Sequence, residues 1–174
     1  MVDAQTIGVL VTATSVSVAA IYYIFTLRIN MKAREMEIAH LCLSETISDE
    51  GLQRFATVMT MEGKNAEDFM EKYGYLNPEM FGKWTSQLFS YETRGILLKS
   101  KVVDAEKLYV LGGYGAIRIW EKYKDIIKYR RDAEWGQDYM SNFEFYAGEM
   151  MKIKMKRDAS FKDKLEAYSR TMES

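Results

Sequence analysis

The sequence predicts an all-α protein, with a single N-terminal transmembrane helix followed by a small cytosolic helical bundle of about six helices. No charged residue occurs between Asp3 and Arg28. Later apolar residues recur at spacings of three and four, which is typical of helices that pack on one face. No segment shows the alternation of apolar and polar residues that a strand requires. We therefore expect two parts, an anchor with a juxtamembrane helix at 1–43 and a cytosolic helical domain at 44–174.

The apolar segment at residues 7–27 is long enough to cross a membrane. A helix rises about 1.5 Å per residue and the hydrocarbon core is about 30 Å thick, so about 20 residues span it. A cleavable signal peptide is one alternative, but it needs a positive start and a small-residue cleavage site. Here Asp3 precedes the apolar segment and the bulky Tyr22 and Tyr23 end it. The pattern favours a membrane anchor over a signal peptide and over a buried helix of a soluble protein.

Cations follow the span directly, at Arg28, Lys32 and Arg34. Because cytoplasmic flanks carry an excess of Lys and Arg, we expect a single-pass protein of the cell membrane with its N-terminus outside and its C-terminal domain in the cytoplasm. The only cysteine, Cys42, cannot form an internal disulfide, which fits a reducing compartment.

Small residues form one face of the predicted span, at Gly8, Thr12, Ser15 and Ala19. Such a face lets two transmembrane helices approach closely. We expect membrane lipids around this helix and a protein partner that packs against it or against the cytosolic bundle.

The charge balance argues against nucleic acid as a partner. All 24 Lys and Arg lie after residue 27, and so do 25 − 1 = 24 acidic residues, since only Asp3 precedes them. Non-specific nucleic-acid binding needs a positive field, which a neutral domain lacks. The sequence predicts no metal or cofactor site either, because Glu37 and His40 form a single Glu-x-x-His pair and the chain has one histidine.

Capping residues predict where the first helices of the domain begin. Ser48 is a typical N-cap, and Asn65 with Asp68 starts a short helix that ends at Gly74. Asn77 precedes a proline at the first position of the longest domain helix. The expected apolar faces consist of Leu52, Phe55, Ala56 and Met59 in the first of these helices, and of Phe81, Trp84, Leu88, Tyr91, Gly95 and Leu98 in the longest.

The second half of the domain follows the same pattern. Asp104 caps a brief helix that ends near Leu111, and glycines at 112 and 113 predict a tight connection with left-handed backbone. The next helix starts near residue 114, Asp132 is expected to cap another, and Ser160 opens a last short one.

Glu92 is the most conspicuous polar residue of the longest domain helix, because it lies next to the buried face. We expect it to form a structural ion pair with Arg118, Arg130 or Arg131. The alternative is an enzyme with an unrecognised site near Glu92, Arg118 and Arg130. No second catalytic group accompanies them, so the sequence predicts no catalytic residue and favours a protein that is not an enzyme.

A basic stretch at 152–164 contains Lys152, Lys154, Lys156 and Arg157. It is a candidate for contact with anionic lipid or nucleic acid, at about 1 kcal/mol per cation near a lipid surface. The alternative is a solvated helix end.

Residues 89–131 resemble a prokaryotic family of unknown function, whose members carry one N-terminal transmembrane helix and a helical cytosolic domain. The shared features are Tyr91, Glu92, Gly95, Asp104, Gly112, Gly113, Trp120 and Arg130. The resemblance implies a membrane-tethered helical module and brings no established activity. It singles out Glu92, Trp120 and Arg130 as a structural core or a site.

Taken together, these features predict a membrane-anchored helical interaction module, an accessory or stabilising subunit of a larger membrane protein complex. The prediction depends on the anchor, on its small face and on the lack of a catalytic constellation in the sequence.

Overall fold

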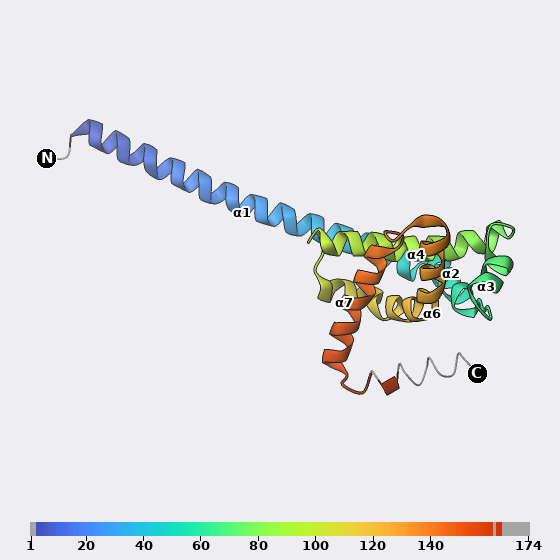
Figure 1. Ribbon diagram of the computed structural model, residues 1–174. Coiled ribbons are helices and arrows are strands. Elements are labelled where there is room, and N and C mark those ends of the chain that lie inside the picture. Colours follow the sequence, from blue (N-terminus) through green and yellow to red (C-terminus); the bar gives the residue numbers. More distant parts are fainter. Residues whose placement is uncertain (1–2, 162, 165–174) are drawn as a thin grey trace. The chain divides into compact units, whose positions relative to one another are not determined.

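The computed structural model describes residues 3–161, 163 and 164, and their regular structure is helical throughout (Figure 1). No strand occurs within these ranges, which confirms the all-α prediction. The elements are α1 (Ala4–Ile47), α2 (Asp49–Thr60), α3 (Ala66–Tyr73), α4 (Pro78–Lys99), α5 (Ala105–Leu108), the π-helical turn η1 (Tyr109–Gly113), α6 (Tyr114–Arg130), the π-helical turn η2 (Arg131–Trp135) and α7 (Ser141–Arg157). The rest of the helix expected from Ser160 lies outside the described residues.

The chain divides into two compact units, Met1–Ile38 and Ala39–Ser174. The first unit consists of α1 up to Ile38. Its most apolar 18-residue window has a mean hydropathy of 1.9, and none of that window is buried. The hydroxyls of this segment bond back to the helix itself, as Thr14 Oγ1 does to the Leu10 carbonyl at 2.8 Å. The helix is long and apolar enough to cross a membrane, a property that an N-terminal signal sequence can share.

The helices α2 to α5 of the second unit begin where their capping residues predict. Ser48 Oγ accepts a hydrogen bond from the Gly51 amide at 3.0 Å, and Asn65 Oδ1 accepts one from the Asp68 amide at 2.8 Å. Asp104 Oδ1 does the same for the Glu106 amide at 2.7 Å. Each cap satisfies an amide that has no partner within its helix, and this is why the local sequence determines these starts.

The expected cap of the last long helix, Asp132, is wrong. The chain instead continues from α6 through η2, and α7 begins at Ser141 after Met140, whose φ of 56° is left-handed. Met140 offers no capping side chain. The first amides of α7 are satisfied across the fold by Glu92 of α4, and a local sequence pattern cannot reveal such a partner.

The glycine connection is confirmed in part, because the backbone is left-handed at Gly112, with φ of 118°, but not at Gly113. A side chain at Gly113 would begin 2.6 Å from the Met150 sulfur, so this glycine permits a close approach of α7. The two glycines therefore serve different purposes, a turn and a close contact.

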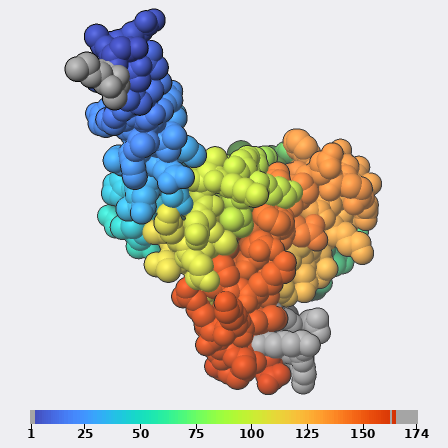
Figure 2. All heavy atoms as spheres, turned by 90° about the vertical axis from the view of Figure 1, so that its left-hand side faces the viewer, coloured from blue at the N-terminus to red at the C-terminus, as the bar shows by residue number. Residues whose placement is uncertain are grey.

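The core of the second unit forms around α4, which packs against α2 and α7, while α7 also packs against α6. The surfaces of α4 and α7 meet in the space-filling view (Figure 2). At their crossing a Cβ on Gly95 would lie 2.0 Å from the Asn142 carbonyl oxygen, so only glycine fits. The largest fully buried apolar side chains are Trp84, Tyr123, Tyr146, Phe69, Phe143, Leu88, Leu108, Ile117, Ile119, Ile127 and Met140.

The face expected for α2 is wrong in its details. Leu52 is 53% exposed and Ala56 is exposed, whereas the buried residues of this helix are Gly51 and Val58. Leu52 and Phe55 point instead toward a cavity of the domain, which is the candidate site.

Candidate functional site

A cavity of about 280 Å³ lies within the second unit, where the last turn of α1, α2, α4 and the start of α6 approach one another. Its walls are mostly apolar, and polar side chains enter from all four of these helices. The described residues that line it are Thr46, Gly51, Leu52, Arg54, Phe55, Gln87, Ser90, Tyr91, Arg94, Gly112, Tyr114, Gly115 and Arg118. We call it the arginine cavity.

Three arginines from three different helices line the arginine cavity: Arg54 of α2, Arg94 of α4 and Arg118 of α6. No Asp or Glu is among its described lining residues. The carboxylate of Glu45 lies next to the cavity and pairs with both Arg54 and Arg94, so these two cations share one anion.

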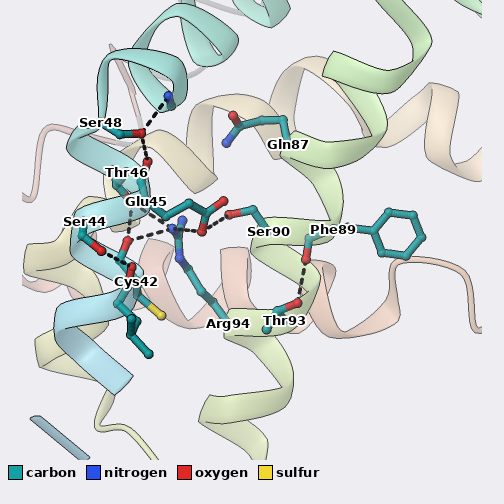
Figure 3. A network of polar contacts seen from close by, with 12 residues as sticks. Cys42, Ser44, Glu45, Thr46, Ser48, Gln87, Phe89, Ser90, Thr93 and Arg94 are labelled. Atoms are coloured by element: carbon teal, nitrogen blue, oxygen red, sulfur yellow. Dashed lines mark hydrogen bonds and ion pairs between the residues drawn. The ribbon is translucent and has the colours of Figure 1, made fainter. Parts of the chain in front are cut away.

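Arg94 is the most buried of the three, at 3% exposure, and it connects α4 to the last turns of α1 (Figure 3). Its Nη2 donates to Thr46 Oγ1 at 2.8 Å, to the Cys42 carbonyl at 3.1 Å and to Glu45 Oε2 at 3.2 Å. Its guanidinium also lies 5.3 Å from the centre of the Tyr91 ring. No described residue accepts a hydrogen bond from its buried Nε. One nitrogen therefore carries three contacts, while another carries none.

Glu45 joins the polar groups of this network, as Figure 3 shows. Its Oε1 accepts a hydrogen bond from Arg54 Nη2 at 2.8 Å, and its Oε2 accepts one from Ser90 Oγ at 3.1 Å in addition to that from Arg94. Arg54 also donates through Nε to Gln87 Oε1 at 3.3 Å. The Glu45 side chain is 42% exposed, so this anion lies at the edge of the domain and not in its interior.

The opposite wall of the arginine cavity is built around glycine. A Cβ on Gly115 would lie 3.1 Å from the Tyr91 hydroxyl and 3.4 Å from Phe55, so a side chain there would narrow the space. Burial raises the pKa of Tyr91 to about 12, against a smaller opposing effect of Arg94. The Tyr91 hydroxyl therefore keeps its proton at neutral pH and can act as a donor. Gly112 belongs to η1, where Leu111 and Gly112 leave helical geometry and the chain kinks between α5 and α6.

Glu92 has other partners than the expected arginines. Its Oε2 accepts a hydrogen bond from the Phe143 amide at 2.6 Å, and its Oε1 accepts one from Asn142 Nδ2 at 2.7 Å. A carboxylate at a helix N-terminus satisfies free amides and complements the helix dipole. Glu92 therefore caps α7 from α4.

Arg130 is buried at 1% exposure within a cluster of five aromatic rings. Its guanidinium lies 5.2 to 5.7 Å from the ring centres, and it pairs with Glu134 at 3.1 Å. The rings belong to Tyr75, Phe81, Trp84, Trp135 and Tyr139. We call this group the aromatic cluster.

Glu92, Arg118 and Arg130, which the sequence places near one candidate site, have separate surroundings in the structure. Trp120 is half-buried and meets Phe143 edge-on at 5.4 Å, Arg131 pairs with Glu144, and Arg118 lines the arginine cavity. The structure gives Glu92 and Arg130 partners of their own, and both have a packing role.

The basic stretch is largely balanced by acids of the same domain. Lys152 pairs with Glu149, Lys154 with Asp158, and Arg157 with Glu106. Lys156 is exposed, and Lys162 lies outside the described residues. These pairs lower the positive charge that this surface offers to a lipid headgroup or a phosphate.

The small face of α1 is exposed along its length, at Gly8, Thr12, Ser15 and Ala19. A Cβ on Gly8 would meet nothing within 4 Å. Among residues 3–161, 163 and 164, no group of three His, Cys, Asp or Glu side chains is placed to hold a metal ion.

The arginine cavity was not predicted from the sequence. One signal was present, since Arg94 falls three residues after Tyr91 on the buried line of α4, where a cation needs partners. The partners come from Cys42, Glu45 and Thr46, and no spacing rule connects those positions to Arg94.

No family model, curated protein or solved structure matches this chain. The resemblance of residues 89–131 to a prokaryotic family therefore has no match to support it. The structure agrees with the resemblance only in the layout of the chain, in which a long apolar helix near the N-terminus precedes a helical domain.

Proposed function

We propose that this chain is a single-pass membrane protein whose helical domain faces the cytoplasm and acts through protein contacts, as an accessory or stabilising subunit of a membrane complex. The observation that carries the proposal is the first unit. No part of its most apolar 18-residue segment is buried against the rest of the chain, so another medium has to cover those side chains. Lipid is the medium that matches its length and composition.

The polar residues of this helix also suit a lipid environment. Thr12, Thr14 and Ser15 donate their hydroxyls to carbonyls of the preceding turn at 2.8 to 2.9 Å. A hydroxyl that is satisfied within its own helix costs far less in a bilayer than an unpaired one. The cations that begin at Arg28 support an inward-facing C-terminal side.

Two threonines permit a matched test of the membrane anchor. Thr14 and Thr93 are both exposed and both bond to the carbonyl four residues earlier, at 2.8 and 2.9 Å. Thr14→Arg places a charge at mid-span, which costs about 2.5–3.5 kcal/mol on insertion. We expect an alkaline wash to release a large share of Thr14→Arg from membranes, and to leave the wild type and Thr93→Arg in the pellet.

Two outcomes would contradict the anchor. Release of the wild type by the same wash would show that lipid does not cover α1. An intact mass that lacks the first residues would show that the segment is a cleaved signal sequence. The proposed orientation is tested by adding protease to sealed vesicles. The C-terminal domain should be protected in right-side-out vesicles and digested in inverted ones.

Neighbouring alanines provide a matched test of the subunit role. Ala19 belongs to the small face, whereas Ala20 lies about 100° around the helix from it. In mild detergent extracts of the native membrane we expect the wild type and Ala20→Leu to migrate as part of a larger complex, and Ala19→Leu to dissociate from it. A wild type that migrates as a monomer would contradict the subunit role while leaving the anchor intact.

A further inference from the structure

The arginine cavity combines features that packing by itself does not require. Arg94 is 3% exposed and shares with Arg54 a single carboxylate, which is itself 42% exposed. Buried cations in proteins are normally paired closely with anions or hydrogen-bonded throughout, because the loss of hydration is expensive. Here the buried Nε of Arg94 has no acceptor among the described residues, two of the three lining arginines share the carboxylate of Glu45, and an empty space lies beside them.

We infer that the arginine cavity binds a small organic anion, whose carboxylate or phosphate meets Arg94 and Arg118 and whose apolar body lies against Phe55 and Leu52. The inference concerns the helical domain only and does not depend on the proposed membrane anchor. Arginine suits this role because its planar guanidinium offers several donors to an oxyanion.

The dimensions of the cavity limit the ligand. Its volume of about 280 Å³ lies at the low end of small-molecule sites, which hold about 300–1,000 Å³. A compact ring or a short chain with one anionic group fits this space, and a diacyl lipid does not. The mostly apolar walls exclude a bare inorganic ion as the best ligand, since it would leave those walls without a partner.

Glu45 acts as the competitor of the ligand in this arrangement. Its carboxylate is held by Arg54, Arg94 and Ser90, which is the coordination that an external carboxylate or phosphate would seek. Being partly exposed, Glu45 can turn into water when the anion enters. Removal of its charge should therefore strengthen binding, although the same change weakens an ordinary structural ion pair.

The experiment uses phenyl phosphate as the probe and the full chain in nanodiscs of zwitterionic lipid, with empty nanodiscs as the blank. Calorimetric titration should show saturable binding with a Kd of about 1 mM or tighter. Phenol, which lacks the anion, and inorganic phosphate, which lacks the ring, should each bind at least about tenfold more weakly.

Three variants connect this binding to the cavity. Arg118→Gln should weaken it about tenfold or more, by the loss of a charge-assisted contact. Arg157→Gln makes the same change of charge at a residue that pairs with Glu106 elsewhere in the domain, and should leave binding unchanged. Glu45→Gln should strengthen it about three- to fivefold, as expected for loss of one partly exposed competing charge. Circular dichroism confirms that each variant is folded.

Absence of saturation up to about 10 mM phenyl phosphate, in both the wild type and Glu45→Gln, would overturn the inference. Equal losses in Arg118→Gln and Arg157→Gln would overturn it too, because binding would then follow net charge and not the cavity. Because Glu45→Gln acts in the opposite direction from Arg118→Gln, simple loss of folding cannot imitate the expected pair of results.

Discussion

Among the described residues of the helical domain, Arg94 and Arg130 are both almost completely buried, yet oxygens dominate around the first and aromatic rings around the second. Arg94, at 3% exposure, donates to oxygens of Cys42, Glu45 and Thr46 beside a cavity. Arg130, at 1% exposure, is surrounded by the five rings of the aromatic cluster.

The difference shows how the same side chain can serve two purposes. Aromatic faces attract a cation through their quadrupole, and they fill space at the same time, so the aromatic cluster stabilises Arg130 by packing as well as by charge. Neither guanidinium is fully satisfied, since the buried Nε of each has no acceptor among the described residues. The two differ in the space beside them, because the rings fill the surroundings of Arg130 while Arg94 lines the arginine cavity. We therefore regard Arg130 as a structural residue and Arg94 as part of a binding site.

The largest expected effect is that of Arg130→Ala. It removes the centre of the aromatic cluster and leaves a cavity, and we expect the free energy of unfolding to fall by about 3–5 kcal/mol. Urea unfolding of the full chain in detergent, followed by near-ultraviolet circular dichroism, measures this. Arg157→Ala, at an exposed position, is the matched control and should change stability by less than about 0.5 kcal/mol.

A smaller loss is expected for Arg94→Ala, of about 2–3 kcal/mol in the same assay. The Thr46 hydroxyl and the Cys42 carbonyl lose a donor, but Glu45 is already 42% exposed and can be hydrated. The new space also joins an existing cavity. A loss equal to or larger than that of Arg130→Ala would contradict the distinction between the two arginines.

The smallest effect concerns Glu134, the acid that pairs with Arg130 and is 36% exposed. Burial raises its pKa, but hydrogen bonds from Arg130, Tyr75 and Trp135 outweigh burial and hold the pKa below the ordinary value. A lowered pKa in the folded state means stability that is present above the unfolded pKa, near 4.3–4.5, and is lost as the pH falls through the folded pKa.

Glu134→Gln tests this by its dependence on pH. At pH 7 the variant should be less stable than the wild type, by less than about 1 kcal/mol because the pair is partly exposed. The difference should shrink as the pH is lowered below about 4. A difference that stays constant between neutral and acidic pH would show that the carboxylate charge contributes nothing to the aromatic cluster.

The sequence by itself determined the helical class, the apolar first helix and the starts of α2 to α5. These features depend on local physics, since a cap such as Ser48 or Asn65 satisfies amides within three residues of itself. The length of the apolar segment and the spacing of apolar residues can also be read directly from the sequence.

Only the tertiary structure decided the role of Glu92, the start of α7 and the existence of the arginine cavity. Glu92 and Phe143 lie 51 positions apart, and Arg94 and Cys42 lie 52 apart, yet their atoms meet within 3.1 Å. Such contacts arise when helices cross, as at Gly95, and the crossing is fixed by the joint packing of many side chains. A buried charge reveals from the sequence that a partner is needed, but only the packed helices show which partner it finds and what space remains beside it.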